Sequence, residues 1–249
     1  IYHQDDTRLN INKLVEEIEY RYDLNCDLDS FYTSCSSDAF LSPAIKRWKG
    51  MRLSTPYSFY EFMVVTTMLQ NTVVRRSVQM LQNLFDSYGE KISFDNKTLC
   101  AFWMPTTIDQ IEEQALRNIK LGYRAKTMKR QAAEYISGKA NPMILRKLSK
   151  DDLKKALLNL YGIGPATVQY TLFEIFHHYD ALDHIPPWEQ KIYSKMFYDQ
   201  ELVDVPTILN DINKRYGKWK ALAVHYIFED LFWLRKNENI PWLEALIRL

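Results

Sequence analysis

The chain has 249 residues, enough for one large or two small domains with a proper hydrophobic core. It carries 32 Lys and Arg against 31 Asp and Glu, and this net charge of +1 does not mark the chain as a whole as a nucleic-acid binder. Aromatic residues make up 14%, glycine contributes only 7 residues, and period-two alternation is hard to find, so we expect an all-α protein.

Apolar residues at helical spacing dominate the first half of the chain. Residues 9–22 predict an amphipathic helix, and residues 58–70, apolar on nearly every side, predict a buried one. Leu99 to Met104 is a short apolar segment that Pro105 stops. Further helices are expected at 42–49, ending near Gly50, at 73–88, closed by Gly89, at 108–118, started by a capping box of Thr107 and Gln110, and at 127–137.

Basic residues gather between Lys120 and Lys155, where eleven Lys or Arg face only three acidic residues. A DNA duplex is held mainly through neutralised phosphates, and a local basic face is enough for that. An ordinary solvated helix face is the alternative. Within this segment, Ser149 and Asp152 predict the cap of the next helix.

The stretch Leu-Tyr-Gly-Ile-Gly-Pro-Ala-Thr, Leu160 to Thr167, lies between two helical patterns and predicts a tight hairpin. Gly162 and Gly164 can take positive φ without a Cβ penalty, and Pro165 suits the first position of the following helix. The N–H groups of that helix start, with the positive end of its dipole, favour an anion such as a DNA phosphate. A helix corner that binds nothing is the alternative.

A rigid turn follows 22 to 25 residues later, where Pro186-Pro187-Trp188-Glu189 delivers a carboxylate to a helix start. Here the sequence resembles the helix-hairpin-helix DNA glycosylases, whose hairpin is followed at this distance by a proline-containing turn and a catalytic aspartate. The resemblance is closest to the alkylpurine (3-methyladenine) branch, in Asp183 to Glu189 and in Tyr216 to Ala223, which is similar to the "W-x-x-x-A" helix of that branch. Helices are expected at 189–198, 206–215, 218–235 and 241–248.

Three more segments are similar to motifs of this superfamily, including its 8-oxoguanine branch. Cys26 to Tyr32 resembles "D-L-x-x-[FL]-Y", Gly50 to Phe62 resembles "G-x-R-x … P-F-E", and Gly122 to Lys126 resembles "G-[FY]-R-x-[KR]-A". The resemblance implies an all-α, two-lobed glycosylase fold. A helical barrel domain, residues 57–185, would end in the hairpin, and residues 1–56 and 186–249 would form a second helical domain from both chain ends.

The resemblance places Glu189 at the catalytic aspartate of the family and Asp183 at a second acidic position. Base removal builds positive charge on the sugar, and a nearby carboxylate stabilises that charge and orients the attacking water. Glu is one methylene longer than Asp, which moves the charge by about 1.5 Å, and a shift of this size can cost about a hundredfold in rate. A backbone offset around Glu189, Asp183 in its place, and loss of activity all stay open, as does an ordinary first-turn glutamate.

Relatives that also cut the strand carry a lysine two residues after the second hairpin glycine, where this chain has Ala166. The resemblance therefore implies a water nucleophile, a monofunctional glycosylase without lyase activity and an intact abasic site as product. Lys191 is the alternative nucleophile, although a first-turn lysine is usually just solvated.

The resemblance also implies residues that hold the DNA and the extruded base. Gln70 and Asn71 are candidates for filling the gap that the base leaves, with helix-end capping amides as the alternative. Trp188, Tyr57 and Trp219 are candidate walls of the base pocket, although most of the 34 aromatic residues must be core. An electron-rich wall would favour a cationic alkylated purine. The DNA-binding candidates are Gly162, Ile163, Gly164, Ala166, Thr167, Gln70, Asn71, Arg124 and Lys126.

No required cofactor is expected. Hairpins of this family commonly hold a monovalent cation on backbone carbonyls, here those of Leu158, Leu160 and Ile163. No cysteine follows Cys100, so the four-cysteine iron–sulfur loop of the branch resembling endonuclease III is not expected. A local set of candidate metal ligands consists of His177, His178, Asp180, Asp183 and His184.

The expected partner is double-stranded DNA with a damaged base, bound by a monomer, with no membrane partner. Three widely spaced cysteines, without a signal peptide or long apolar span, predict reduced thiols and a cytoplasmic location with access to DNA. Excision of 8-oxoguanine or a deaminated base, non-catalytic binding of damaged DNA, and a helical scaffold without DNA contacts stay open as alternatives.

Overall fold

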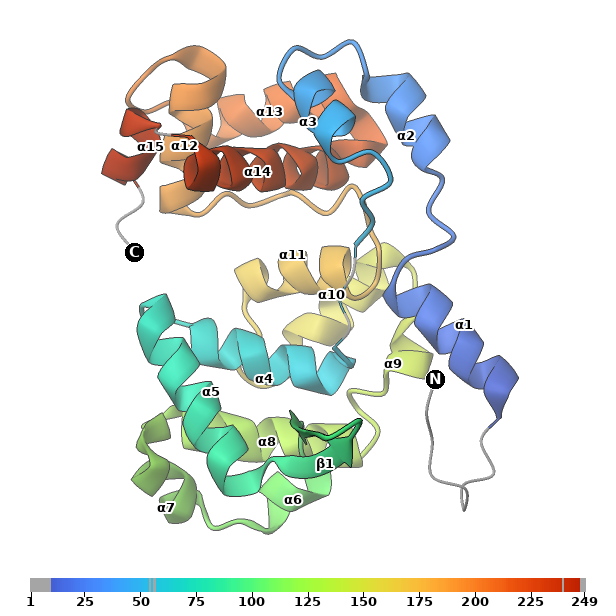
Figure 1. Cartoon of the computed structure of the whole chain (residues 1–249), viewed down its shortest axis with the longest axis vertical. Coiled ribbons are helices and arrows are strands. Elements are labelled where there is room, and N and C mark those ends of the chain that lie inside the picture. Colours follow the sequence, from blue (N-terminus) through green and yellow to red (C-terminus); the bar gives the residue numbers. More distant parts are fainter. Residues whose placement is uncertain (1–9, 54, 56, 239, 247–249) are drawn as a thin grey trace. The chain divides into compact units, whose positions relative to one another are not determined.

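The structure is a computed structural model that describes residues 10–53, 55, 57–238 and 240–246. These residues form helices and one two-stranded antiparallel sheet (Figure 1), which confirms the predicted all-α class. None of the helices in the described part of the chain combines the length and the apolar character that a membrane span requires.

The chain divides into two compact units. Among the described residues, unit 1 contains 10–53, 55, 173–238 and 240–246, and unit 2 contains 57–172. The domain boundaries expected at 56 and 185 stay a prediction.

Unit 1 is built around helix α14 (Lys220–Asn237), which packs against α3 (Leu41–Arg47) and α13 (Val205–Tyr216). Its core is aromatic: the fully buried ring of Phe31 lies 5.2 Å from Tyr226 and 5.6 Å from Trp219. Such ring pairs stabilise beyond their buried area. The other elements are α1 (Ile11–Arg21), α2 (Leu28–Cys35), α12 (Pro187–Tyr198), the 3-10 turn η2 (Gly217–Trp219) and α15 (Pro241–Leu246).

Unit 2 is built around α4 (Phe59–Leu69), which packs against α5 (Val74–Tyr88) and α8 (Arg124–Ile136). Seven of its eleven residues are buried, as its sequence predicted, and Ser58 and Glu61 form a capping box at its start. The other elements are β1 (Glu90–Phe94), β2 (Lys97–Ala101), α6 (Pro105–Gln110), α7 (Glu113–Leu116), the π-turn η1 (Arg117–Leu121), α9 (Pro142–Leu145), α10 (Lys150–Leu158) and α11 (Pro165–Glu174), whose last turn enters unit 1.

The β1–β2 hairpin departs from the expectation drawn from the sequence. Ile92 pairs with Leu99, and the turn residues Asp95 and Asn96 both adopt positive φ, as a tight two-residue hairpin turn requires. Every residue of β1 is exposed. Five-residue strands that lie on the surface leave only a weak alternation in the sequence, and the Asp-Asn pair was their clearest signal.

The start of α6 corrects a second prediction. The expected capping box of Thr107 and Gln110 does not form, because the helix already begins at Pro105, with Met104 as its N-cap and no capping side chain. Proline is well suited to the first helical position, where its missing N–H costs nothing. The helix expected at 108–118 is instead divided among α6, α7 and η1.

Candidate active site

The glycine hairpin connects α10 to α11. Ser149 caps α10 by accepting a hydrogen bond from the N–H of Asp152 at 3.2 Å, as predicted. Gly162 has φ +77°, and a Cβ there would lie 2.6 Å from Cγ2 of Thr127. Gly164 is outside the left-handed region, and a Cβ there would meet no atom within 4 Å. The fold therefore requires glycine at position 162, whereas at 164 the space beside the backbone is open.

The start of α11 has the features of an anion site. Pro165 is its first residue, as predicted, and the N–H of Val168 donates to the carbonyl of Gly164 at 2.9 Å. Ala166 and Thr167 precede Val168 and are half-buried, and amides at this position in a helix have no intrahelical acceptor. Together with the helix dipole they favour a negative group.

Gln70 and Asn71, the two candidates for filling a gap in DNA, differ in the structure. The side-chain amide of Gln70 donates to the carbonyl of Gly162 at 2.9 Å, across 92 residues of sequence. Asn71 is exposed and has φ +49°. The structure thus brings Gln70 to the hairpin and leaves Asn71 at the surface of the turn between α4 and α5.

Arg124 and Lys126, both predicted to contact DNA, also differ in their surroundings. The side chain of Arg124 is 7% exposed; its Nε donates to the carbonyl of Thr67 at 3.1 Å, and its Nη2 donates to the carbonyl of Gln70. Lys126 is exposed on α8. The Arg124 guanidinium therefore satisfies carbonyls at the C-terminal end of α4, where a helix lacks internal donors.

Glu189 lies in the first turn of α12 and is only 7% exposed. Tyr193, one helical turn further on and fully buried, donates its hydroxyl to Oε2 of Glu189 at 3.4 Å. Pro186 is the N-cap, and the helix start favours a negative charge at this position. A buried carboxylate with a hydroxyl donor is a group whose position is fixed by its surroundings.

Asp183 has different surroundings. It precedes α12, its side chain is 51% exposed, and its Oδ1 pairs with Nζ of Lys220 at 3.2 Å. His177, another member of the candidate metal set, has its Nδ1 3.4 Å from the buried carboxylate of Asp23. No three His, Cys, Asp or Glu side chains of the described residues gather into a metal-binding group, so the candidate metal set between 177 and 184 is not assembled.

The three candidate base-pocket aromatics occupy separate surroundings. Trp188 is 49% exposed and meets Phe228 edge-on with ring centroids 6.1 Å apart. Trp219 is 5% exposed, packs on Tyr179 at 5.2 Å, and its buried indole N–H has no hydrogen-bond partner within the described structure. Tyr57 belongs to unit 2 and is exposed. Of the three, Trp188 combines an exposed ring with a place next to Glu189.

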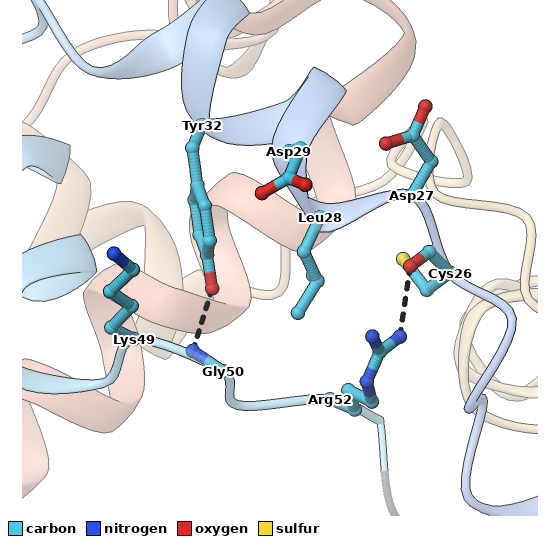
Figure 2. A pocket seen from close by; sticks show the side chains of 8 residues that line it. All are labelled: Cys26, Asp27, Leu28, Asp29, Tyr32, Lys49, Gly50 and Arg52. Atoms are coloured by element: carbon cyan, nitrogen blue, oxygen red, sulfur yellow. Dashed lines mark hydrogen bonds between the residues drawn. The ribbon is translucent and has the colours of Figure 1, made fainter.

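A shallow pocket of about 310 Å³ lies in unit 1, where two of the sequence motifs meet (Figure 2). The hydroxyl of Tyr32 accepts a hydrogen bond from the N–H of Gly50 at 2.8 Å, and Arg52 donates to the carbonyl of Cys26 at 2.9 Å. None of the predicted site residues lines it; its lining is Cys26, Asp27, Leu28, Asp29, Tyr32, Lys49, Gly50 and Arg52. The shared motifs thus have a local structural role, which their sequence alone did not reveal.

The hairpin carbonyls proposed for a monovalent cation are partly engaged in the turn. The carbonyl of Leu160 accepts a hydrogen bond from the N–H of Ile163 at 3.3 Å. A carbonyl has two lone pairs, so this hydrogen bond does not use the whole acceptor capacity of the Leu160 oxygen. Binding of the ion through Leu158, Leu160 and Ile163 stays a prediction.

Comparisons with known proteins agree with this architecture, although no family model matches the chain. A probable N-glycosylase/DNA lyase of Methanothermobacter thermautotrophicus is 22% identical over 86% of this chain and 74% of its own length. A DNA-3-methyladenine glycosylase of Bacillus subtilis is 22% identical over 88% of this chain and 73% of its own length.

Solved structures give the same result. The 3-methyladenine DNA-glycosylase of Archaeoglobus fulgidus matches with a TM-score of 0.74 and 16% identity, covering 91% of this chain and 78% of that one. The Clostridium acetobutylicum 8-oxoguanine glycosylase/lyase, in complex with double-stranded DNA, matches with a TM-score of 0.72 and 19% identity, covering 93% and 78%. The protein thus has the fold of the helix-hairpin-helix DNA glycosylases. The resemblance found in the sequence is confirmed at the level of this superfamily, which includes both 3-methyladenine and 8-oxoguanine glycosylases.

Proposed function

We propose that the protein is a DNA glycosylase of base excision repair that flips a damaged, alkylated purine out of duplex DNA and hydrolyses its N-glycosidic bond. The observation that carries the proposal is the buried carboxylate of Glu189 at the start of α12, 25 residues after the second glycine of the hairpin. Solvent screens the electrostatic interaction of an exposed glutamate with the sugar. Burial reduces this screening, so a buried carboxylate stabilises developing positive charge more strongly.

In the proposed reaction the chain supplies binding and electrostatics. Gly164 and the first amides of α11 bind a phosphate of the damaged strand, and Lys126 adds positive charge. The Glu189 carboxylate stabilises the oxocarbenium character of the sugar as the bond to the base breaks, and it orients a water molecule that adds to the anomeric carbon. The water gives up its proton to the Glu189 carboxylate as it adds, the cationic alkylpurine leaves as a neutral base with the bonding electron pair, and an abasic site remains.

The absence of strand cleavage rests on the residue at position 166. Alanine there cannot form a Schiff base with the sugar, and Lys191 is exposed on α12. Two of the similar proteins are named as lyases, so this part of the proposal needs its own test: borohydride treatment of the reaction should trap no covalent protein–DNA adduct.

Alkylated purines are the substrate class that the exposed ring favours. Trp188 directly precedes Glu189 in the sequence and is 49% exposed, so part of its ring is accessible to a flipped base. A cationic alkylpurine gains cation–π attraction that a neutral base lacks. Two of the similar proteins are named for 3-methyladenine, and another is named for 8-oxoguanine, which makes oxidised guanine the second candidate.

The proposal includes a monomer that acts on double-stranded DNA without a required cofactor, in a reducing cytoplasm. A monovalent cation at the hairpin would strengthen phosphate binding but would take no part in bond cleavage. Non-catalytic recognition of damaged DNA is the competing function, because Glu stands where the family has Asp.

Single-turnover base release on a panel of duplexes tests the proposal. The panel contains 3-methyladenine or 7-methylguanine, 8-oxoguanine, hypoxanthine and an undamaged control. Release from the alkylated duplex, with an alkali-labile but uncut strand, is the expected result. Tight binding to every lesion without release from any of them would favour the non-catalytic function instead.

A further inference from the structure

The α4–α5 turn and the glycine hairpin, two loops of unit 2, are joined by a side-chain hydrogen bond. The turn from α4 to α5 begins at Gln70, and the hairpin contains Tyr161 and Gly162. Gln70 Nε2 donates to the carbonyl of Gly162 at 2.9 Å. The amide that would have to enter a DNA duplex is therefore already bonded to the hairpin.

Gln70 is also held by its main chain. Arg124 on α8 donates to the carbonyl of Gln70 and, at 3.1 Å, to that of Thr67 one turn earlier. Gln70 has an extended backbone at the C-cap of α4, with φ −64° and ψ 130°. Since both its carbonyl and its side chain are bonded, rotation of the side chain toward a duplex would break the contact to the hairpin.

A second connection runs parallel to the first, through the interior. Gln131 on α8 is 1% exposed, and its Nε2 donates to the hydroxyl of Thr67 at 3.0 Å and to the carbonyl of Tyr161 at 3.2 Å. The N–H of Tyr161 donates to Oε2 of Glu134, again on α8, at 2.8 Å. Both main-chain polar groups of Tyr161 are thus fixed by α8, which packs on α4.

We propose that Gln70 and Gln131 are positioning residues that hold the α4–α5 turn and the hairpin at a fixed separation, so that both meet one DNA duplex together. Gln70 is then a strut, and Asn71, exposed and at φ +49°, is the side chain that the turn offers to DNA. This inference rests on the proposed function, because it assumes that the hairpin binds DNA.

The physical reason is preorganisation. Each loop alone would lose conformational freedom on binding, and rigid attachment to a common support removes that cost beforehand. The buried amide of Gln131 has one arrangement that satisfies its partners, since any other leaves a buried polar group without a partner. These hydrogen bonds therefore fix the separation of the two loops before DNA binds.

The test is binding of undamaged duplex and of a duplex with a tetrahydrofuran abasic analogue, measured over a range of salt concentrations. Gln70→Met keeps the length of the side chain but removes the donor. Gln110→Met, an exposed glutamine on α6 of the same unit, is the matched control. Asn71→Gly, which keeps the positive φ without strain, removes the exposed side chain. Circular dichroism checks folding of each variant.

The strut predicts that Gln70→Met weakens binding of both duplexes by about fivefold, the factor that corresponds to one hydrogen bond. The slope of log K against log salt should become shallower by about 1, the loss of about one phosphate contact. Asn71→Gly should weaken only the abasic duplex, and Gln110→Met should match the wild type. Gln131→Met should give the same loss as Gln70→Met, and the two losses should not add.

The proposal is overturned if Gln70→Met binds undamaged DNA as the wild type does and loses only the abasic duplex, because Gln70 would then fill the gap itself. No effect on either duplex overturns it too. Because the readout is binding, a wild type that binds without releasing any base contradicts the proposed function and leaves the strut testable. A wild type that binds no duplex contradicts both.

Discussion

The hydroxyl of Tyr193 lies 3.4 Å from Oε2 of Glu189, and both side chains are buried on adjacent turns of α12. Tyr193 is itself fixed by rings on either side, Phe197 stacked at 5.8 Å and Phe228 edge-on at 5.3 Å. The carboxylate proposed to face the sugar is therefore oriented by a donor that cannot easily move. Predictions about Glu189 depend on this pair.

Removing the donor should slow base release without abolishing it. Tyr193→Phe keeps the ring contacts and loses one hydrogen bond to the carboxylate, so single-turnover release should fall about five- to tenfold. Tyr198→Phe, on the same helix and bonded to Asp211 at 2.7 Å, is the matched control and should release the base at the wild-type rate. Equal rates for all three proteins would show that the Tyr193 hydroxyl does not orient Glu189.

Shortening the proposed catalytic carboxylate to the aspartate of the family should lower the rate of base release. Since α12 places the longer side chain against Tyr193, Glu189→Asp should withdraw the charge by about 1.5 Å and lower the release rate by about a hundredfold. Glu201→Asp, at an exposed position after α12, serves as the control. A faster Glu189→Asp enzyme would mean that the backbone is placed for aspartate and that the glutamate is an impaired substitute.

The two hairpin glycines should respond differently to alanine. At 162 the positive φ and the 2.6 Å approach to Thr127 predict a loss of about 1–3 kcal/mol of unfolding free energy, seen as a lower midpoint in urea. At 164 the space is open, so stability should change by less than about 0.5 kcal/mol. Gly164→Ala should nevertheless weaken duplex binding, because its Cβ would stand where a phosphate approaches. Undiminished binding would place the DNA elsewhere.

His225 should make the stability of unit 1 depend on pH. Burial against Phe173, with ring centroids 5.6 Å apart, lowers the pKa of His225 to about 4 from the ordinary 6.5. Between pH 6.5 and about 4, His225 binds a proton in the unfolded chain but not in the folded protein. The contribution of neutral His225 to the free energy of unfolding is therefore complete above pH 6.5 and is lost as the pH falls to about 4. Its size is about 3 kcal/mol.

Urea unfolding of His225→Phe and the wild type between pH 4 and 7 measures that contribution. On acidification, the unfolding free energy of the variant should fall by about 2–3 kcal/mol less than that of the wild type. The other titrating groups are the same in both proteins and cancel in this difference. Parallel curves for the two proteins would show that His225 is protonated in the folded state.

Much of the fold could be predicted because its signals are local. Apolar residues on nearly every side predicted the buried helix α4. The cap at Ser149, which depends only on residues three apart, predicted the start of α10. The glycine hairpin was also predicted from the sequence, although only Gly162 of its two glycines adopts a positive φ. The exposed β1–β2 hairpin was missed because strands without a buried face carry little hydrophobic pattern.

The candidate site was less predictable, because its decisive contacts join distant residues. No sequence pattern predicts that the Gln70 side chain donates to the carbonyl of Gly162, or that the Arg124 guanidinium donates to the carbonyl of Thr67 at the end of α4. Tyr193 was the exception: it follows Glu189 by four residues, the spacing at which side chains meet on a helix, and could have been proposed as its partner.

Single-turnover release of an alkylated purine by the wild type, Glu189→Gln and Asp183→Asn tests the central claim most directly. Glu189→Gln should lower the rate by about 10²–10³-fold while binding of an abasic duplex persists, whereas Asp183→Asn, at an exposed carboxylate paired with Lys220, should stay within a few-fold of the wild type. The reverse order of the two variants, or equal release by all three proteins, would contradict the assignment of Glu189 as the acid that acts on the sugar.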